Sequence, residues 1–192
     1  MEDLKLYIDL GLGHVLDWQA YDHVLFLVVL TVFYGFADWK KVIWLITIFT
    51  LGHTLSLALS AYNVVYIEMD IIEFAIPLTI FITAVYNMIT VKRPPKSVRI
   101  TVFFAFIFGL IHGFGFSSYF KILVDDTESK LLPLIEFAIG IEFAQLIIVL
   151  FILILSFLVL SLFKRSKRDW ILVISSIVIG IVIPMLIERK FW

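Results

Sequence analysis

Long apolar runs fill most of this chain of 192 residues, and they restrict what it can fold into more than any other feature. A membrane-spanning helix needs about 20 mainly apolar residues. The chain is 62% hydrophobic and 16% charged, whereas soluble domains have about 45–50% apolar and about 25% charged residues. We therefore predict an all-α polytopic membrane helix bundle that forms one membrane domain over 1–192. We expect about six transmembrane helices in this domain, over residues 22–36, 42–62, 71–91, 98–120, 133–163 and 170–187.

Three parts of this series depart from a standard span. Segment 22–36 is short, so we expect its helix to extend backwards through polar residues. Segment 133–163 would be about 46 Å long as a helix, which exceeds the roughly 30 Å hydrocarbon core and requires a tilt or a protruding end. Near the N-terminus, Leu4, Ile8 and Leu12 recur every four residues, which predicts a short interfacial helix lying on the membrane. A frayed terminus is the alternative.

Positive charges gather in alternate connections. Lys40 and Lys41 follow the first span, four Lys or Arg residues lie in 92–99, and four more lie in 164–168. Because positively charged loops stay cytoplasmic, we expect these connections inside and both chain termini outside. The net charge of −1 offers no basic surface for nucleic acid, and the lack of cysteine excludes thiolate metal sites.

All four histidines lie in or beside predicted spans, although a titratable side chain inside a membrane is costly and marks a candidate functional site. Along its span, His53 lies about 16 Å from Val42, and His112 lies about 21 Å from Val98. Glu142 enters from the opposite side, nine residues past Pro133. The topology therefore brings these side chains to one layer in the outer half of the membrane.

Imidazole and carboxylate together suit a divalent transition metal, with zinc or nickel expected first. The candidate ligands are His14, His23, His53, His112, Asp22 and Glu142, and the expected supporting residues are Ser56, Gln145 and Glu73. Asp22, Glu73 and Glu136 would attract a cation at the outer mouth. A proton relay, or hydrogen bonds between helices, would use the same histidines without a metal.

Glycines surround His112 at Gly109, Gly113 and Gly115. Small residues let helices approach closely or let the backbone open beside a ligand. We expect one of these two outcomes, with the run 113–116 as the place for a helix break.

Four ordered motifs resemble the HupE/UreJ family of small polytopic bacterial membrane proteins. The motifs are Gly13-His14 with Tyr21-Asp22-His23-Val24-Leu25-Phe26, then Phe49–Ser56, Phe108–Phe116 and Gly140–Gln145. Seven residues separate His14 from Asp22, and His112 has no second histidine beside it. In both respects the chain is similar to the second, less characterised branch of the family. The resemblance implies a protein of the bacterial cytoplasmic (inner) membrane that handles a metal, in a family linked to nickel supply for hydrogenase and urease.

Three functions follow from these observations. The first is a nickel-type permease or uptake component for a divalent transition metal. The second is an intramembrane zinc hydrolase that acts on a lipid or lipid-linked substrate, with Glu142 or Asp22 as general base. The third is a noncatalytic membrane partner with a structural metal. The expected partners are the lipid bilayer and the metal ion, and no nucleic acid is expected. The sequence leaves open whether the protein forms a homo-oligomer.

Overall fold

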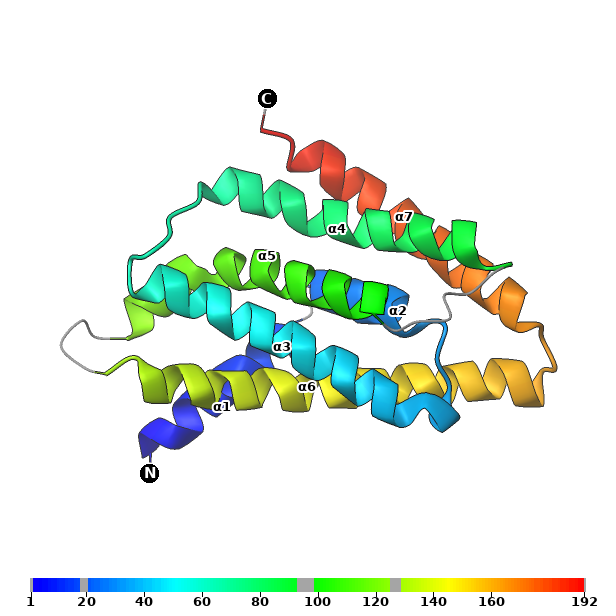
Figure 1. The fold of residues 1–192 in the computed structure, drawn as a ribbon, viewed down its shortest axis with the longest axis horizontal. Helices are drawn as coiled ribbons and strands as arrows, with labels where there is room; N and C mark the ends of the chain where they lie inside the picture. The colour runs from blue at the N-terminus through cyan, green and yellow to red at the C-terminus, as the bar shows by residue number, and fades with distance from the viewer. Residues whose placement is uncertain (1, 18–20, 93–98, 125–128, 192) are drawn as a thin grey trace.

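The computed structural model describes residues 2–17, 21–92, 99–124 and 129–191, and within these ranges it is a helical bundle without strands (Figure 1). The predicted all-α fold is confirmed. In chain order the helices are α1 (Glu2–Leu16), α2 (Asp22–Thr31), the 3-10 turn η1 (Phe36–Asp38), α3 (Trp39–Ala61), α4 (Met69–Thr90), α5 (Arg99–Leu123), α6 (Leu131–Phe157), the π turn η2 (Leu158–Leu162) and α7 (Lys167–Glu188).

Five of the described helices are long and apolar enough to cross a membrane, namely α3 to α7 together with their attached turns. They run along the long axis of the bundle and connect at its two ends (Figure 1). We call the end where α3, α5 and α7 begin the basic end, because Lys40, Lys41 and the 164–168 connection lie there. That this end faces the cytoplasm stays a prediction.

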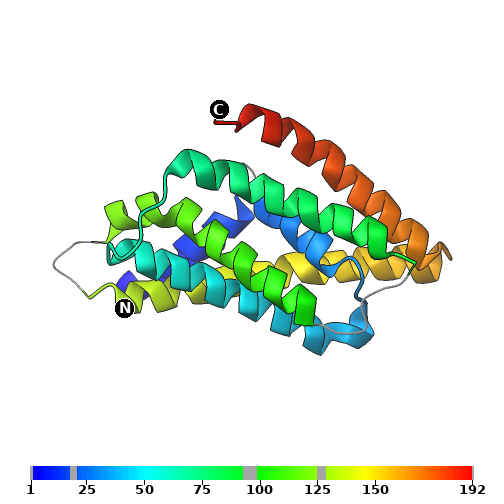
Figure 2. The ribbon, with the colours of Figure 1, turned by 45° about the horizontal axis from the view of Figure 1, so that its top comes forward.

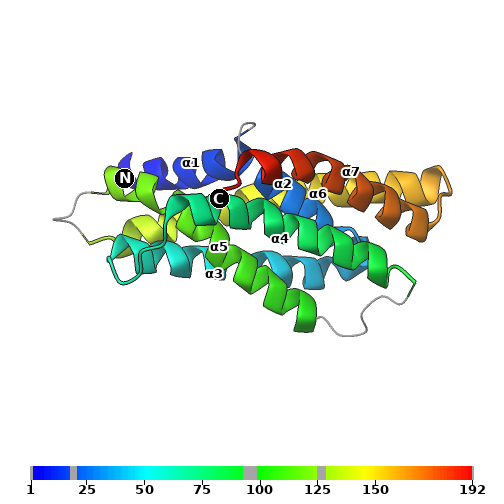
Figure 3. The same ribbon diagram turned by 90° about the horizontal axis from the view of Figure 1, so that it is seen from above.

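The first expected span is not one helix. α2 has only 10 residues, about 15 Å of helix, and it does not continue backwards into α1, which ends at Leu16. The two helices instead lie end to end along the long axis (Figures 1 and 3). α2 begins at Asp22, and a carboxylate in the first turn favours a helix start because it faces the positive end of the helix dipole.

The expected N-terminal helix forms, and it packs against another helix of the bundle. A methyl group on Gly11 of α1 would collide with the carbonyl oxygen of Phe137 in α6, and one on Gly140 would collide with that of Ile8. The two backbones therefore touch, and Val15 is completely buried. Whether α1 also lies at the membrane surface stays a prediction.

The glycines of α5 produce a close helix crossing and no helix break. α5 runs without interruption from Arg99 to Leu123 and lies beside α3 (Figure 2). A methyl group on Gly109 would meet the carbonyl oxygen of Phe49, and one on Gly113 would meet that of His53. The expected break at 113–116 is wrong because the small residues let the two helices approach, and their backbone hydrogen bonds stay intact.

α6 has the length expected from its apolar run. With its π turn it covers Leu131–Leu162, 32 residues, or about 48 Å. Phe143, Phe151 and Leu162 lie on it as exposed side chains, which suits a surface in contact with lipid.

Candidate metal centre

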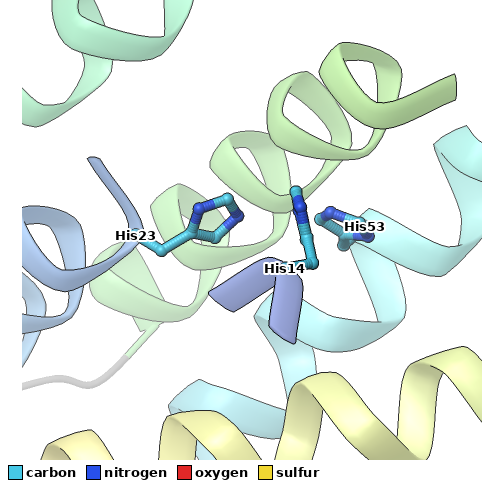
Figure 4. A group of neighbouring side chains, drawn as sticks. All are labelled: His14, His23 and His53. Carbon is cyan, nitrogen blue, oxygen red and sulfur yellow. The ribbon is translucent and has the colours of Figure 1, made fainter. Parts of the chain in front are cut away.

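Three histidines from three helices meet inside the bundle. His14 lies in the last turn of α1, His23 in the first turn of α2, and His53 in the second half of α3. One ligand atom from each lies within 4.8 Å of the others, and the His14 ring lies between the other two (Figure 4). His53 is completely buried and His23 nearly so. We call these three side chains the histidine cluster.

His112 adjoins the histidine cluster from α5. Its ring centroid lies 5.2 Å from that of His23, and its side chain is buried. Its Nδ1 lies 2.7 Å from the carbonyl oxygen of Phe108, one turn earlier in the same helix. All four histidines of the chain are thus neighbours, although His112 is not among the three whose ligand atoms converge.

Hydrogen bonds leave one nitrogen free on each of two rings. The Nδ1 atom of His23 lies 3.0 Å from a carboxylate oxygen of Asp22. A carboxylate and a carbonyl only accept hydrogen bonds, so Nδ1 of His23 and Nδ1 of His112 are the donors. Both rings then carry a lone pair on Nε2, which is the atom a metal can use.

The remaining ring nitrogens of the histidines have no hydrogen-bond partner within the part of the chain that the structure describes. His14 Nε2, His23 Nε2, His112 Nε2 and both ring nitrogens of His53 are buried without a hydrogen-bond partner. A buried unpaired polar atom costs about 1–3 kcal/mol. Several such atoms gathered at one point fit a ligand set for a cation, because a bound metal would pair with the lone pairs and remove this cost.

Asp22 supports the cluster through His23. Its carboxylate accepts a hydrogen bond from the His23 backbone N–H, at 2.9 Å, as well as from the ring. Arg189, just after the end of α7, approaches it to 3.7 Å. A carboxylate behind a histidine fixes the ring orientation of metal-ligating histidines and makes them better ligands. Asp22 therefore lies where it can orient a ligand.

The glycine crossings explain why these helices hold the histidines in register. Gly11 lies one turn before His14, Gly52 directly precedes His53, and Gly113 directly follows His112. A methyl group on any of the three glycines would collide with backbone of the facing helix. The points of closest helix approach thus coincide with the ligand positions.

A groove leads to the cluster from the surface. It has a volume of about 650 Å³ and is lined by residues of α1 and α5 and by Asp17, which follows α1. His14 lies in its wall with Asp9 and Asp17, and Phe116 and Tyr119 face them from α5. The two carboxylates place negative charge on the wall of this groove, which favours a cation.

Aromatic side chains close the opposite side of the cluster. Phe26, Phe49 and Phe108 are buried, and the rings of Phe26 and Phe49 lie 5.6 and 5.3 Å from that of His112. Phe26 also contacts Phe108, at 5.4 Å between centroids. The cluster therefore adjoins the groove at His14, and this aromatic floor seals it toward the basic end.

The chain matches a known protein family. The family model described as HupE / UreJ protein matches residues 1–189, nearly the whole chain. The chain belongs to the HupE/UreJ family. No curated protein and no solved structure matches it.

Glu142 of this HupE/UreJ protein lies apart from the histidine cluster. Its carboxylate accepts hydrogen bonds from the hydroxyl groups of Thr47, at 2.6 Å, and of Thr50, which also lies 3.0 Å from Gln145 Oε1. Thr50 precedes His53 by about one turn of α3, on the side of the basic end. We call this group, Thr47, Thr50, Glu142 and Gln145, the Glu142 group. It forms a second polar position about 4.5 Å further along the bundle axis.

The remaining predicted residues lie around the centre without joining it. The Ser56 hydroxyl donates to the backbone carbonyl of His53, at 3.0 Å. Glu73 is exposed in the second turn of α4, and its backbone carbonyl lies 3.5 Å from Arg189. Glu136 is buried in α6 and is not among the residues whose ligand atoms converge.

Several contributing residues were not anticipated. Thr47 and Thr50 precede His53 at steps of three, a helical spacing that could have revealed them. Asp9 lines the groove, but a carboxylate near a chain end gives no such signal. Arg189 is brought to Asp22 only by the packing of α7.

Proposed function

We propose that this protein is a permease that carries a divalent transition-metal ion across the membrane. The observation that supports it best is the convergence of buried, unpartnered imidazole nitrogens from α1, α2 and α3. The HupE/UreJ family is associated with nickel and cobalt uptake. The substrate would be nickel, cobalt or zinc, since neutral imidazole suits each of them.

The ligand chemistry disfavours copper(I). Soft cuprous ions prefer thiolate and thioether ligands, and the chain has no cysteine and only four methionines. Three imidazoles, with a fourth beside them, leave the metal without a bound carboxylate. A ligand set of neutral groups suits a cargo that must be released, because an anionic cage would hold the cation more tightly.

The interruption between α1 and α2 supports transport. Discontinuous helices whose ends meet near a binding site recur in membrane transporters, where non-helical backbone is tolerated if it lines a cavity. His14 lies at the end of one helix and His23 at the start of the next. A small change in the angle between the two helices would separate these ligands and release the ion.

The proposed route has three stages. The groove with Asp9 and Asp17 collects the cation, and the histidine cluster holds it. The Glu142 group offers the next polar position toward the basic end. The aromatic floor of Phe26, Phe49 and Phe108 separates the cluster from that end, so passage requires these rings to move, and the described arrangement corresponds to the state open toward the groove.

The aromatic floor also favours the second candidate function, the zinc hydrolase. A metal centre that opens to one side only could activate water without passing the ion on. In that case the histidine cluster would hold the metal, and Asp22 would orient His23 from behind its ring. Glu142 would be too occupied with its two threonines to act as general base.

Uptake into proteoliposomes distinguishes the two functions. Wild-type protein, His53→Phe and a control, Ser175→Ala in α7, are reconstituted with a metal-sensitive dye inside the vesicles, and nickel, cobalt or zinc is added outside. We expect uptake by the wild type and the control and none by His53→Phe. Metal binding without uptake of any of the three ions, with newly formed lipid breakdown products in the mass spectrum, would favour the hydrolase and contradict the permease.

A further inference from the structure

A second cavity lies toward the basic end of the bundle, away from the histidine cluster. It has a volume of about 360 Å³, and residues of α2, η1, α3, α4, α5 and α7 line it. None of the four histidines and no residue of α1 or α6 contributes to its wall. We call it the basic-end cavity.

Positive charge dominates the wall of this cavity. Lys41, Lys167, Arg168 and Asp38 all line it. Asp38 is neutralised by Lys41, whose Nζ lies 2.7 Å from its carboxylate. Lys167 also acts on Asp38 through its charge, so the four side chains together leave two positive charges in excess, and the cavity repels metal ions and attracts anions.

The start of α7 adds to the positive electrostatic potential in the cavity. Lys167 and Arg168 occupy the first turn of this helix, after the cap in which the Ser166 hydroxyl accepts from the Asp169 N–H. The helix dipole is positive at this end, so cations there are unfavourable and an anion is favourable. An anion in the cavity would offset the repulsion between the dipole and both side chains.

The rest of the wall suits the remainder of a phosphate-bearing molecule. Val29, Leu30 and Phe104 supply apolar surface, and Tyr34 and Thr101 carry hydroxyl groups. Asn87 donates from its side chain to the carbonyl of Val29, at 2.7 Å, which keeps the end of α2 ordered beside the cavity. Basic pockets between transmembrane helices are sites for anionic lipid headgroups.

We propose that the basic-end cavity binds a phosphate group, either of an acidic phospholipid headgroup or of free phosphate. This site is separate from the metal centre and independent of the metal's identity. Its alternative is that Lys167 and Arg168 serve only to orient the chain in the membrane, as the neighbouring Lys164 and Arg165 do. That alternative requires no ligand and predicts that the pair Lys167 and Arg168 behaves like the pair Lys164 and Arg165.

The test compares two pairs of substitutions of equal charge change. Lys167→Gln with Arg168→Gln removes the cations that line the cavity, whereas Lys164→Gln with Arg165→Gln removes two cations of the same connection that do not line it. All four side chains are exposed. Each purified protein is titrated with phosphatidylglycerol or phosphatidylcholine of the same acyl chains, and bound lipid is counted by native mass spectrometry. In a second arm, the thermal midpoint is followed with inorganic phosphate.

We expect the wild type to retain phosphatidylglycerol in preference to phosphatidylcholine. Losing two cations should weaken this binding about thirtyfold, and the 164/165 pair should bind as the wild type does. If inorganic phosphate raises the thermal midpoint, only the 167/168 pair loses this effect, and no lipid is preferred, the site is supported and is assigned to free phosphate. Equal losses in the two pairs, or no response to either phosphatidylglycerol or phosphate, would overturn the proposal.

Discussion

Replacing His53 by phenylalanine should make the metal-free protein more stable and remove its response to metal. His53 is completely buried with both ring nitrogens unpartnered. Its ring packs near those of Phe49 and Phe137, each 6.2 Å away between centroids. A phenyl ring suits this aromatic surrounding and is somewhat larger than an imidazole ring, so the substitution removes unpaired polar atoms without opening a cavity.

The expected magnitude follows from those two nitrogens. Each unpaired buried group costs about 1–3 kcal/mol, so with two such nitrogens the metal-free variant should gain about 2 kcal/mol at the lower end of that range. For a chain of this length, that corresponds to a rise of about 2–4 °C in the unfolding midpoint per kcal/mol. Metal at a hundredfold excess over its dissociation constant should stabilise the wild type by about 2.7 kcal/mol and His53→Phe not at all, so the difference between the two midpoints shifts by that amount in favour of the wild type.

Thermal unfolding followed by the fluorescence of the five tryptophans measures both effects, first with a chelator and then with added nickel, cobalt or zinc. Gln145→Leu is the matched control, because it also removes a buried unpartnered nitrogen but lies in the Glu142 group. It should keep the metal response. If His53→Phe lowers the metal-free midpoint and still responds to metal, then His53 is a packing residue with satisfied hydrogen bonds and the reasoning is refuted.

Four further outcomes are expected. Asp22→Ala should weaken metal binding about 10–100-fold by calorimetry, because it releases the His23 ring; an unchanged affinity would show that the carboxylate does not position this ligand. Gly109→Ala should cost about 1–3 kcal/mol in thermal unfolding because its methyl group meets the backbone of α3, whereas Gly180→Ala, with nothing within 4 Å of its methyl group, should not destabilise. Lowering the pH should weaken metal binding, since protons compete for the imidazole lone pairs, and a pH-independent affinity would argue against histidine ligands. Glu142→Gln should slow uptake in proteoliposomes without changing metal affinity, and a loss of affinity would instead place Glu142 among the ligands.

The sequence alone determined the class of the fold. Hydropathy is a property of consecutive residues, so the runs that became α3 to α7 could be recognised without any knowledge of their neighbours. A polar side chain is costly inside a membrane, and this cost marked the histidines as candidate ligands. The order of the four motifs was enough to suggest the HupE/UreJ family, which the match over residues 1–189 confirmed.

Tertiary structure decided which polar residues meet. Glu142 and His53 were expected in one layer, yet Glu142 binds Thr47 and Thr50 because the α3–α6 packing turns it toward them. Depth along a helix can be counted from the sequence, but the direction in which a side chain points depends on which helices touch and where. Here the glycine contacts between α1 and α6 and between α3 and α5 set those positions, and they bring His14, remote from His53 in the sequence, into the same cluster.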